Sequence, residues 1–367
     1  MKPRRNPSLA MVGLTWREAP TSLRSVAAAP LTGELWAGLV AQGARGMVEV
    51  HTCARSLWLV EADDAGWTGA ILQSLVESRL QHAGAAVSPA LLLGDEAVRA
   101  LLGITIGLDS FVEGEADVGT QVHEGFAASS AAGRAAPEIA SLARVTSRLA
   151  AEARRSGVVR RGRGMGQLAV DNLAPLGVPP GAPVGVVGAG RIGSQVRGSV
   201  ERAGLLPVMF NRTPRADLLP LDAIVGTELS AIIICTSAPA AWFVPPAGIP
   251  VVDLGRPAQV AGPAVCLDTI LSGPGLRLDG ETRALAQAMV ERAMAEWAAH
   301  EQAHAARARL ARVQALRDQF VQEEIEVVIA AAVADLDAAT RRRVVAAARH
   351  AVRRYSHAVI GALKEET

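Results

Sequence analysis

The sequence predicts a multidomain α/β protein with an N-terminal α+β domain, a central domain built on a parallel sheet, and a C-terminal domain made only of helices. Strand-like and helical runs are mixed over roughly the first 150 residues, whereas short apolar runs alternate with turn residues from 184 to about 275. That alternation is typical of a parallel α/β sheet. Glycine and proline almost disappear after residue 280, which indicates long helices. We expect domains at 1–153, 154–277 and 278–367.

The composition is that of a folded, nearly neutral protein. Its 367 residues suggest two or three domains, and because half are hydrophobic and 20% are charged, disorder is excluded. The 37 basic and 36 acidic residues leave a formal net charge of +1. This balance excludes a histone-like basic protein but leaves a local nucleic-acid face open.

Cysteine usage and hydropathy indicate a reducing, aqueous location. Cys53, Cys235 and Cys266 are too few and too scattered for a disulfide framework or a zinc site, and the histidines lack ligand spacing, so no metal is expected. No signal-peptide core follows the basic start, and the longest apolar stretch, 231–245, is interrupted and too short to span a bilayer. We expect a soluble, cytoplasmic protein.

The N-terminal region predicts strands followed by helices. Apolar or alternating runs at 10–14, 47–50 and 57–60 indicate three strands, with a turn at 51–55 between the last two. The pattern from 138 to 155 is helical and increasingly basic.

The central region begins with a break in every periodicity. The Gly- and Arg-rich stretch 156–166 is expected to be a linker or mobile loop before a helical run at 168–173, and residues 157–166 are a candidate hinge. The strands predicted after it lie at 184–187, 208–210, 231–235 and 251–254.

A glycine-rich loop follows the first of these strands. Residues 188–193, Gly-Ala-Gly-Arg-Ile-Gly, have GxGxxG spacing between a strand and a helical pattern. Such glycines permit a tight turn, close approach of a pyrophosphate and close helix–strand packing, and the helix N-terminus adds amide donors. The motif in this context indicates a Rossmann-type dinucleotide site rather than a merely structural turn. The expected cofactor-binding residues are Gly188, Ala189, Gly190, Arg191, Ile192 and Gly193.

The end of the next strand indicates which dinucleotide is bound. A carboxylate about 20 residues into such a domain binds the ribose diol of NAD. This chain instead has Asn211, Arg212 and Thr213, and a guanidinium beside amide and hydroxyl groups suits a 2′-phosphate. NADPH is therefore the expected cofactor, and the alternative is that Arg212 is a solvated loop charge.

Cys53 is the candidate nucleophile. It lies in a strand-ending turn near Arg55, and a neighbouring cation lowers the pKa of a thiol. Arg55 would equally suit a substrate carboxylate because of its two-pronged geometry. A lone cysteine is more often structural than catalytic, but cysteine together with a reduced nicotinamide is the chemistry of acyl reduction. Thiolate attack gives a thioester, which hydride converts to an aldehyde.

The C-terminal helices leave two arrangements open. An apolar stripe at helical spacing fits packing against a second copy of the chain, and it fits an intramolecular bundle equally well. The stripe consists of Leu310, Val313, Phe320, Val327 and Val328.

In their order along the chain, these features resemble the glutamyl-tRNA reductase family. Thr52-Cys53-Ala54-Arg55 is similar to the family's nucleophile motif, which usually reads Thr-Cys-Asn-Arg. The resemblance covers essentially the whole chain, and the ordered set is more specific than any single motif. The other similar segments are Gly13-Leu14 with Arg17, Ala19-Pro20 and Leu23-Arg24, Gly107-Leu108-Asp109-Ser110 with Gly114-Glu115 and Gln121, the glycine loop, Asn211-Arg212-Thr213, Asp253-Leu254-Gly255-Arg256-Pro257 and the helical tail.

The resemblance implies an activity and site roles. Cys53 would attack the ester carbonyl of glutamyl-tRNA(Glu), and NADPH would reduce the thioester to glutamate-1-semialdehyde, the first step of the five-carbon route to tetrapyrroles. Arg55 would pair with the free substrate carboxylate and give much of the selectivity, since a buried unpaired carboxylate is costly. A homodimer through the C-terminal helices and a semialdehyde-aminomutase partner are also implied. The implied substrate-binding residues are Thr52, Ala54, Arg55, Ser110, Glu115, Ala116, Asp117 and Gln121.

Several positions depart from the family's motifs, although Cys53 and Arg55 persist. These changes bear on rate and amino-acid choice more than on the fold. The usual Asn-His of the first motif is Thr15-Trp16, the Asn after the cysteine is Ala54, the following acidic residue is Leu57, and an activity-assisting histidine is Ala100.

The altered pocket and a basic stretch keep further readings open. Besides the reductase, the alternatives are a diverged reductase of another acyl or aminoacyl donor and a non-catalytic regulatory homologue that binds NADPH or tRNA. The basic stretch is either a phosphate-contacting face for tRNA or an ordinary solvated helix face. It comprises Arg144, Arg148, Arg154, Arg155, Arg160, Arg161 and Arg163.

Overall fold

The computed structural model describes residues 8–160, 162, 164–213, 215, 217–320 and 326–365, so that Arg161 and Arg163 lie outside the described residues. The chain divides into two compact units, residues 1–297 and 298–367. The first unit contains an N-terminal α+β part and a parallel-sheet part, and the second unit is helical.

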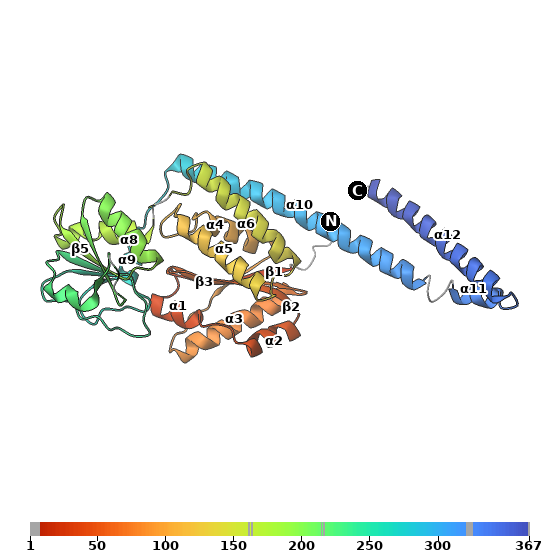
Figure 1. Ribbon diagram of the computed structural model, residues 1–367, viewed down its shortest axis with the longest axis horizontal. Coiled ribbons are helices and arrows are strands. Elements are labelled where there is room, and N and C mark those ends of the chain that lie inside the picture. Colours follow the sequence, from red (N-terminus) through yellow and green to blue (C-terminus); the bar gives the residue numbers. More distant parts are fainter. Residues whose placement is uncertain are drawn as a thin grey trace. The chain divides into compact units, whose positions relative to one another are not determined.

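The N-terminal part is a four-stranded antiparallel sheet covered on both faces by helices. Its elements are β1 (Leu9–Thr15), α1 (Thr21–Ala27), α2 (Gly33–Ala41), β2 (Ala44–His51), β3 (Arg55–Ala62), α3 (Ala65–His82), β4 (Ala90–Leu93), α4 (Asp95–Thr105), α5 (Ala116–Ala131) and α6 (Pro137–Arg155). The strand order is β2-β3-β1-β4. Met11 and Leu59 belong to a core shared with α4–α6, whereas Val12 and Trp58 belong to a second core shared with α1–α3. The helices α4–α6 lie on one side of the sheet and α1–α3 on the other (Figure 1). The three predicted strands and the helix predicted at 138–155 are confirmed.

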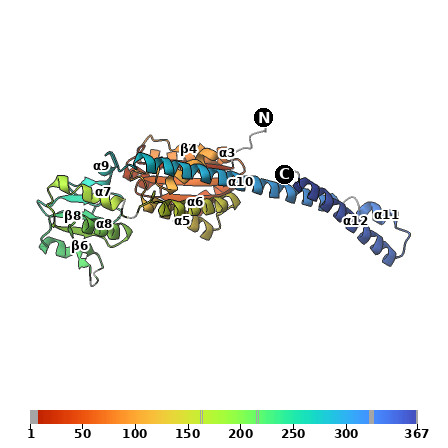
Figure 2. The same cartoon turned by 90° about the horizontal axis from the view of Figure 1, so that it is seen from above.

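The parallel-sheet part follows α6. Its elements are α7 (Met165–Asp171), the 3₁₀ turn η1 (Ala174–Leu176), β5 (Pro183–Val187), α8 (Arg191–Arg202), β6 (Leu206–Asn211), β7 (Leu219–Pro220), the 3₁₀ turn η2 (Leu221–Gly226), β8 (Ala231–Ile234), β9 (Val251–Asp253), β10 (Val265–Cys266) and α9 (Leu267–Leu271). The order β10-β9-β8-β5-β6-β7 is parallel throughout. The helices α7, α8 and α9 pack on one face of it (Figure 2). The four strands predicted here, and the Rossmann-type order around β5, are confirmed.

The linker predicted at 156–166 ends earlier than expected. Helix α7 begins at Met165, and Gly166 lies inside it. A Cβ atom at Gly166 would stand 2.9 Å from the Ser199 hydroxyl and 3.0 Å from the Gln195 carbonyl, both on α8. This glycine therefore permits close packing of two helices rather than a loop.

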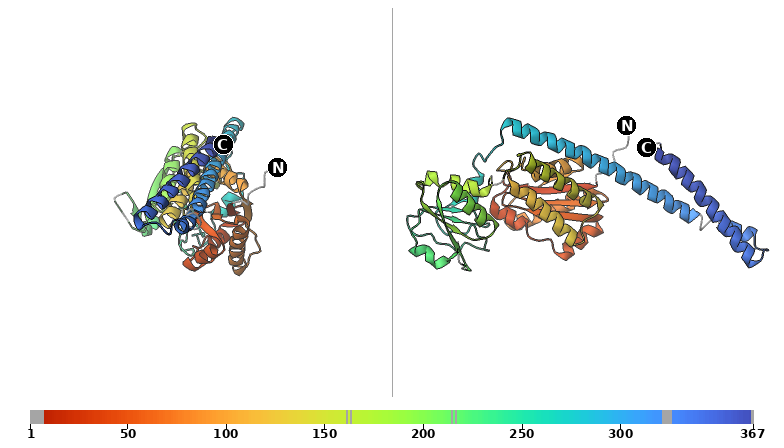
Figure 3. Two further views of the ribbon diagram at one scale, coloured as in Figure 1. Left: turned by 90° about the vertical axis from the view of Figure 1, so that its right-hand side faces the viewer. Right: turned by 45° about the horizontal axis from the view of Figure 1, so that its top comes forward.

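The second unit contains the remainder of α10 (Gly280–Phe320), then α11 (Glu326–Ala332) and α12 (Ala338–Glu365). After α11 the chain reverses, and α12 runs back in the opposite direction (Figure 3). The Asp337 carboxylate accepts the backbone N–H groups of Ala339 at 2.9 Å and Thr340 at 3.0 Å, which caps α12. The long helices predicted for this region are confirmed.

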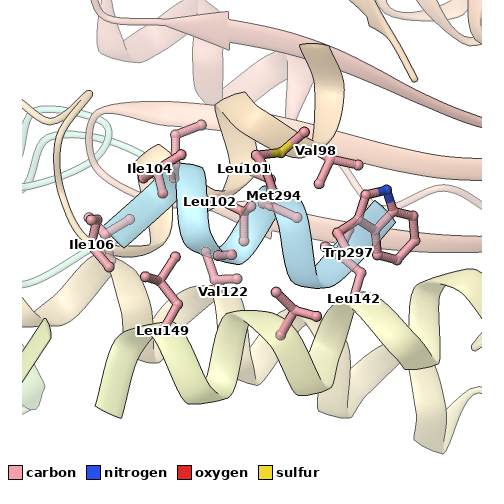
Figure 4. Close-up of a cluster of buried hydrophobic side chains, with 14 of the residues drawn as sticks. Val98, Leu101, Leu102, Ile104, Ile106, Val122, Leu142, Leu149, Met294 and Trp297 are labelled. Atoms are coloured by element: carbon pink, nitrogen blue, oxygen red, sulfur yellow. The ribbon is translucent and has the colours of Figure 1, made fainter. Parts of the chain in front are cut away.

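The first half of α10 packs within the first unit. Met294 and Trp297 lie among side chains of α4, α5 and α6 (Figure 4). The buried carboxylate of Glu113 fixes the start of this segment, because it accepts the Leu278 N–H at 3.0 Å and pairs with Arg283 at 2.8 Å. The compact units therefore divide after Trp297, and the domain division at 278 stays a prediction.

None of the helices in the described part of the chain combines the length and the apolar character that crossing a bilayer requires.

Candidate active site

Cys53 stands at the tip of the turn that joins β2 to β3. The Thr52 hydroxyl accepts the N–H groups of Ala54 at 3.2 Å and Arg55 at 3.1 Å, and the Thr52 N–H donates to the Arg55 carbonyl at 2.8 Å. Threonine hydroxyls stabilise turns in this way. The cysteine at the tip is half-buried.

Three arginines from different elements surround this turn. Arg24 of α1 donates to the Cys53 carbonyl at 2.7 Å, Arg256 donates to the Thr52 carbonyl, and Arg55 begins β3. Burial lowers the pKa of all three guanidinium groups from the usual value. Positive charge is thus concentrated around a single thiol.

The Cys53 thiol titrates far above the usual range. Burial, with the Glu115 carboxylate adding to it, raises the pKa of Cys53 to about 11, while Arg256, Arg24 and Arg55 act in the opposite direction. The thiol is therefore protonated at neutral pH in this arrangement. Its reactivity depends on how far the three cations offset the burial.

Arg55 is buried with unused donors. Its Nη2 atom donates to the Asp109 carbonyl and to the Ser110 hydroxyl, the latter at 3.3 Å. Its Nε and Nη1 atoms are buried without a partner in the structure. The Trp16 ring centroid lies 5.7 Å from this guanidinium. A buried cation with free N–H groups is costly on its own and suits an anionic ligand such as a carboxylate.

Glu115 lies beside this arginine and is itself buried. Desolvation, with Asp117 adding to it, raises the pKa of Glu115 to about 7, although Arg55 and a hydrogen bond from Ser110 oppose the shift. Asp117 in turn accepts the side-chain amide of Gln195 on α8 at 2.7 Å. Of the other predicted pocket residues, the half-buried Ala116 and Gln121 of α5 take no part in these hydrogen bonds.

The glycine loop has the geometry of a phosphate cradle. A Cβ at Gly193 would lie 1.8 Å from the Gly188 carbonyl oxygen, so only glycine fits, and Gly188 has a φ of 107°. A Cβ at Gly190 would meet nothing within 4 Å, which leaves open space before the N-terminus of α8. The rest of the loop is formed by half-buried Ala189 and Ile192 and by exposed Arg191, which pairs with Glu124 at 3.2 Å.

This loop lies at the point where the strand order reverses. β6 pairs on one side of β5 and β8 pairs on the other. Sheets of this kind bind nucleotides at such a reversal of strand order. At the end of β8, Thr236 approaches Gly188, and its hydroxyl is buried without a partner in the structure. A bound ligand would supply the missing hydrogen bond. Cys235 beside it is half-buried, and the desolvation of its thiol raises its pKa, so it is a poor nucleophile.

The three residues expected to select the 2′-phosphate follow β6. The Asn211 side chain donates to the Thr213 carbonyl at 3.0 Å, which shapes the turn, and Arg212 is exposed within it. This leaves the guanidinium available at the surface for an anion, as the prediction requires.

Arg24 and Arg256 lie in segments similar to the family's motifs, and Trp16 is among the departures from them, but none of the three was predicted from the sequence as a catalytic or binding residue. The two arginines contact a turn that is 29 and 204 residues away in the sequence. A usable signal for Arg256 was its place directly after a predicted parallel strand, where loops border the ligand crevice. Within the described residues, no group of three or more His, Cys, Asp or Glu side chains is arranged to hold a metal ion.

The fold and the site together define a class of protein in which a cysteine-bearing α+β part is joined to a Rossmann-type nucleotide-binding part and a helical tail. Residues 12–156 match the family model described as glutamyl-tRNA(Glu) reductase, N-terminal domain. Over these residues the chain is similar to the N-terminal domain of glutamyl-tRNA reductases.

Individual relatives show the extent of the similarity. A glutamyl-tRNA reductase 2 of Nocardioides sp. is 30% identical over 263 residues, which are 63% of this chain and 52% of that protein. A glutamyl-tRNA reductase of Pyrobaculum islandicum is 29% identical over 209 residues, 56% of this chain and 50% of the other. The solved glutamyl-tRNA reductase of Methanopyrus kandleri aligns over 95% of this chain and 99% of its own with 19% identity and a TM-score of 0.48. The chain thus spans about half the length of the curated relatives it matches.

Proposed function

We propose that the protein is an NADPH-dependent glutamyl-tRNA reductase that forms glutamate-1-semialdehyde through a thioester on Cys53. The observation that carries this proposal is the pairing of a cysteine turn with the buried Arg55, whose Nε and Nη1 atoms are free for a substrate carboxylate. The curated relatives, which are named glutamyl-tRNA reductases, support the same reading.

Each residue has a defined task in this reaction. The side-chain carboxylate of the glutamyl group binds Arg55, which places its ester carbonyl at Cys53. The sulfur forms a bond to that carbonyl carbon, the ester C–O bond breaks, and tRNA leaves with a proton on its terminal ribose oxygen. Bound NADPH supplies the hydride that converts the thioester to the aldehyde and frees the thiolate. Among the residues around it, Glu115 has a pKa near neutrality and is suited to hold the thiol proton.

The parallel sheet has the features that a dinucleotide requires. The loop from Gly188 to Gly193 would hold the pyrophosphate, the open space at Gly190 leaves room for it, and the Thr236 hydroxyl lacks a partner. Arg212 with Asn211 and Thr213 would bind the 2′-phosphate, which favours NADPH over NADH.

The α6 helix is the proposed face for tRNA. Arg144 and Arg148 line a groove of about 510 Å³ between α5 and α6, together with His123 and Phe126. Arg148 is exposed but ion-paired with Glu296, so the other exposed arginines carry most of the charge that could reach phosphates. They are Arg144, Arg154, Arg155 and Arg160.

The proposal extends to assembly and location. The second unit would form a homodimer through its exposed apolar side chains, and an aminomutase that consumes the semialdehyde is the proposed partner enzyme. Because charged tRNA and NADPH are its substrates, the enzyme would work in the cytoplasm.

Two experiments test the activity. Purified protein with glutamyl-tRNA and NADPH should form semialdehyde, and Cys53→Ser should form none; full activity of that variant would refute the thioester mechanism. Complementation of a tetrapyrrole auxotroph distinguishes an enzyme from a regulatory homologue, since a protein that only binds NADPH or tRNA would not restore growth.

A further inference from the structure

The loop after β9 is held in one conformation by a buried carboxylate. Asp253 is 1% exposed, and its Oδ1 atom accepts the Gly255 N–H at 2.8 Å. Its Oδ2 atom accepts the N–H groups of Gln259 at 2.6 Å and Val260 at 3.0 Å. A Cβ at Gly255 would stand 2.2 Å from the Gln259 side chain, so the loop closes only around glycine. Arg256 is therefore presented from a rigid support.

The same loop is joined to the loop after β8. The fully buried Gln259 side chain donates to the Ala238 carbonyl at 3.1 Å and accepts the Ala238 N–H at 2.7 Å. It also accepts the indole N–H of Trp242 at 3.1 Å. These two loops border the edge of the sheet where Gly188 and Thr236 lie. The loop that carries Arg256 therefore adjoins the proposed nucleotide crevice.

The Arg256 side chain extends from this loop to the turn that carries Cys53. Its Nη1 atom donates to the Thr52 carbonyl, and its charge acts on the adjacent Cys53 thiol. The other charged groups that face this thiol are Arg24 from α1, Arg55 from β3 and Glu115 from the start of α5. Arg256 is the one among these three cations that belongs to the parallel-sheet part.

We propose that Arg256 is a positioning residue for the nucleophile: through it the nucleotide-binding part fixes the Cys53 turn at the Thr52 carbonyl and supplies positive charge that stabilises the Cys53 thiolate. The inference rests on the proposed function in that Cys53 is the nucleophile. It goes further because it makes formation of the thiolate dependent on the parallel-sheet part. A thiol whose ionisation is favoured by the cofactor-binding part would be acylated more slowly where no hydride can follow.

Three substitutions separate the charge from the hydrogen bond. Arg256→Gln keeps an N–H donor without charge, Arg256→Lys keeps the charge with a smaller donor, and Arg256→Met keeps neither. If the charge stabilises the thiolate, Gln and Met should each slow alkylation of Cys53 near neutral pH about tenfold, equivalent to a pKa one unit higher. Lys should stay within about threefold of the parent protein, since an ammonium restores the charge.

The measurement is the rate of Cys53 alkylation by iodoacetamide between pH 7 and 10, followed on the Cys53 peptide by mass spectrometry in the full-length protein. Cys266 is the internal reference thiol, and Arg197→Met is the matched control, because Arg197 pairs on the surface with Glu201 and Asp217. The readout requires no turnover, so it succeeds or fails independently of semialdehyde formation.

The outcomes are distinct. The proposal is supported if Cys53 is alkylated slowly in Arg256→Gln and Arg256→Met, at a rate near the parent's in Arg256→Lys, and if the alkylation rate of Cys266 is unchanged in all three. Parent-like alkylation rates of Cys53 in folded Arg256→Gln and Arg256→Met variants overturn it. An equal loss of Cys53 alkylation in all three variants, together with a changed rate at Cys266, also overturns it, because it would indicate a general structural effect. If Arg256→Met does not fold, the comparison of Gln with Lys still decides between these results.

Discussion

The Arg55 guanidinium is fully buried, and its Nε and Nη1 atoms have no partner in the structure. A substrate carboxylate would relieve this state, and a lysine ammonium would not reproduce the planar fork. We expect Arg55→Lys to raise KM for glutamyl-tRNA about 10- to 100-fold, or about 1.4–2.8 kcal/mol, with a smaller change in kcat. Steady-state kinetics with NADPH measure this.

A substitution of Arg55 also distinguishes a glutamyl-tRNA reductase from a reductase that acts on another acyl or aminoacyl donor. Arg55→Leu should abolish reduction of glutamyl-tRNA, whereas a reductase for a donor without a free carboxylate would keep its activity on the true substrate. Arg17→Leu is the control. The Arg17 guanidinium also lies over the Trp16 ring, 4.3 Å from its centroid, but it is exposed and paired with Asp109. Its KM should change by less than about threefold.

Glu115 gives the fold a pH dependence with a defined sign. Desolvation raises the pKa of Glu115 in the folded protein to about 7, above its usual value of 4.5, so the folded protein retains a proton that the unfolded chain has lost. Stability from this residue is therefore present below pH 4.5 and lost as the pH rises to about 7.

The variant Glu115→Gln should not show this loss. Relative to the parent, its free energy of unfolding should rise by about 2–3 kcal/mol between pH 5 and pH 8, as measured by chemical denaturation. The exposed Glu124→Gln serves as the control and should leave the pH profile of stability unchanged. A parent protein whose stability follows that of Glu115→Gln across this range would contradict the assignment.

The glycine loop between β5 and α8 offers a matched pair of substitutions. Gly193→Ala places a Cβ 1.8 Å from the Gly188 carbonyl, so it should destabilise the fold by about 1–3 kcal/mol or more. Gly190→Ala meets nothing within 4 Å and should leave the melting temperature unchanged. If the open space holds a pyrophosphate, the added methyl group should nevertheless weaken NADPH binding about tenfold or more, measured by fluorescence titration. Unchanged NADPH affinity in Gly190→Ala would place the pyrophosphate elsewhere.

The secondary-structure elements that could be predicted from the sequence are those whose pattern lies within one short segment of the chain. The strand, the GxGxxG loop and helix α8 were predictable because residues 184–202 carry the whole pattern themselves. Gly166 misled the prediction of the linker, because a glycine that permits helix packing looks the same in a sequence as one in a loop.

The candidate site was predictable only where its residues are neighbours in the chain. Cys53 and Arg55 lie on one turn, so their pairing was expected, whereas the contact from Arg256 spans 204 residues and depends on how two loops are folded. Trp16, a departure from the family's motif, has its own physical role: its ring packs edge-on against Phe111 at 6.1 Å and lies beside the Arg55 guanidinium. That role follows from packing and not from the motif.

Within the first unit, the cysteine-bearing part and the parallel-sheet part are joined by specific polar contacts. Besides the Arg256 bond, Gln195 donates to Asp117 at 2.7 Å, and the Thr21 N–H donates to Asp268 at 2.8 Å. Any hinge at 157–166 would have to break these contacts, so the predicted hinge requires that cofactor or substrate binding offset their loss. Scattering profiles that are identical with and without NADPH would refute the swinging motion.

The whole molecule is expected to be a dimer because the second unit exposes apolar side chains that water does not favour. Leu316, Val327 and Val328 are 58%, 62% and 62% exposed, and burial of such surface contributes about 25 cal/mol per Å². The double variant Leu316→Glu/Val327→Glu should weaken a dimer at least about 100-fold, or about 2.8 kcal/mol, because two carboxylates would be desolvated in the interface. Light scattering after size exclusion, over a range of protein concentrations, measures this.

Val225→Glu introduces the same charge at a valine that is 83% exposed in the parallel-sheet part, and it should leave the dimer intact. A parent protein that stays monomeric at every concentration, or a double variant that dimerises like the parent, would rule out this surface as the interface, whereas selective loss of the dimer in the double variant would establish that the second unit holds two copies together.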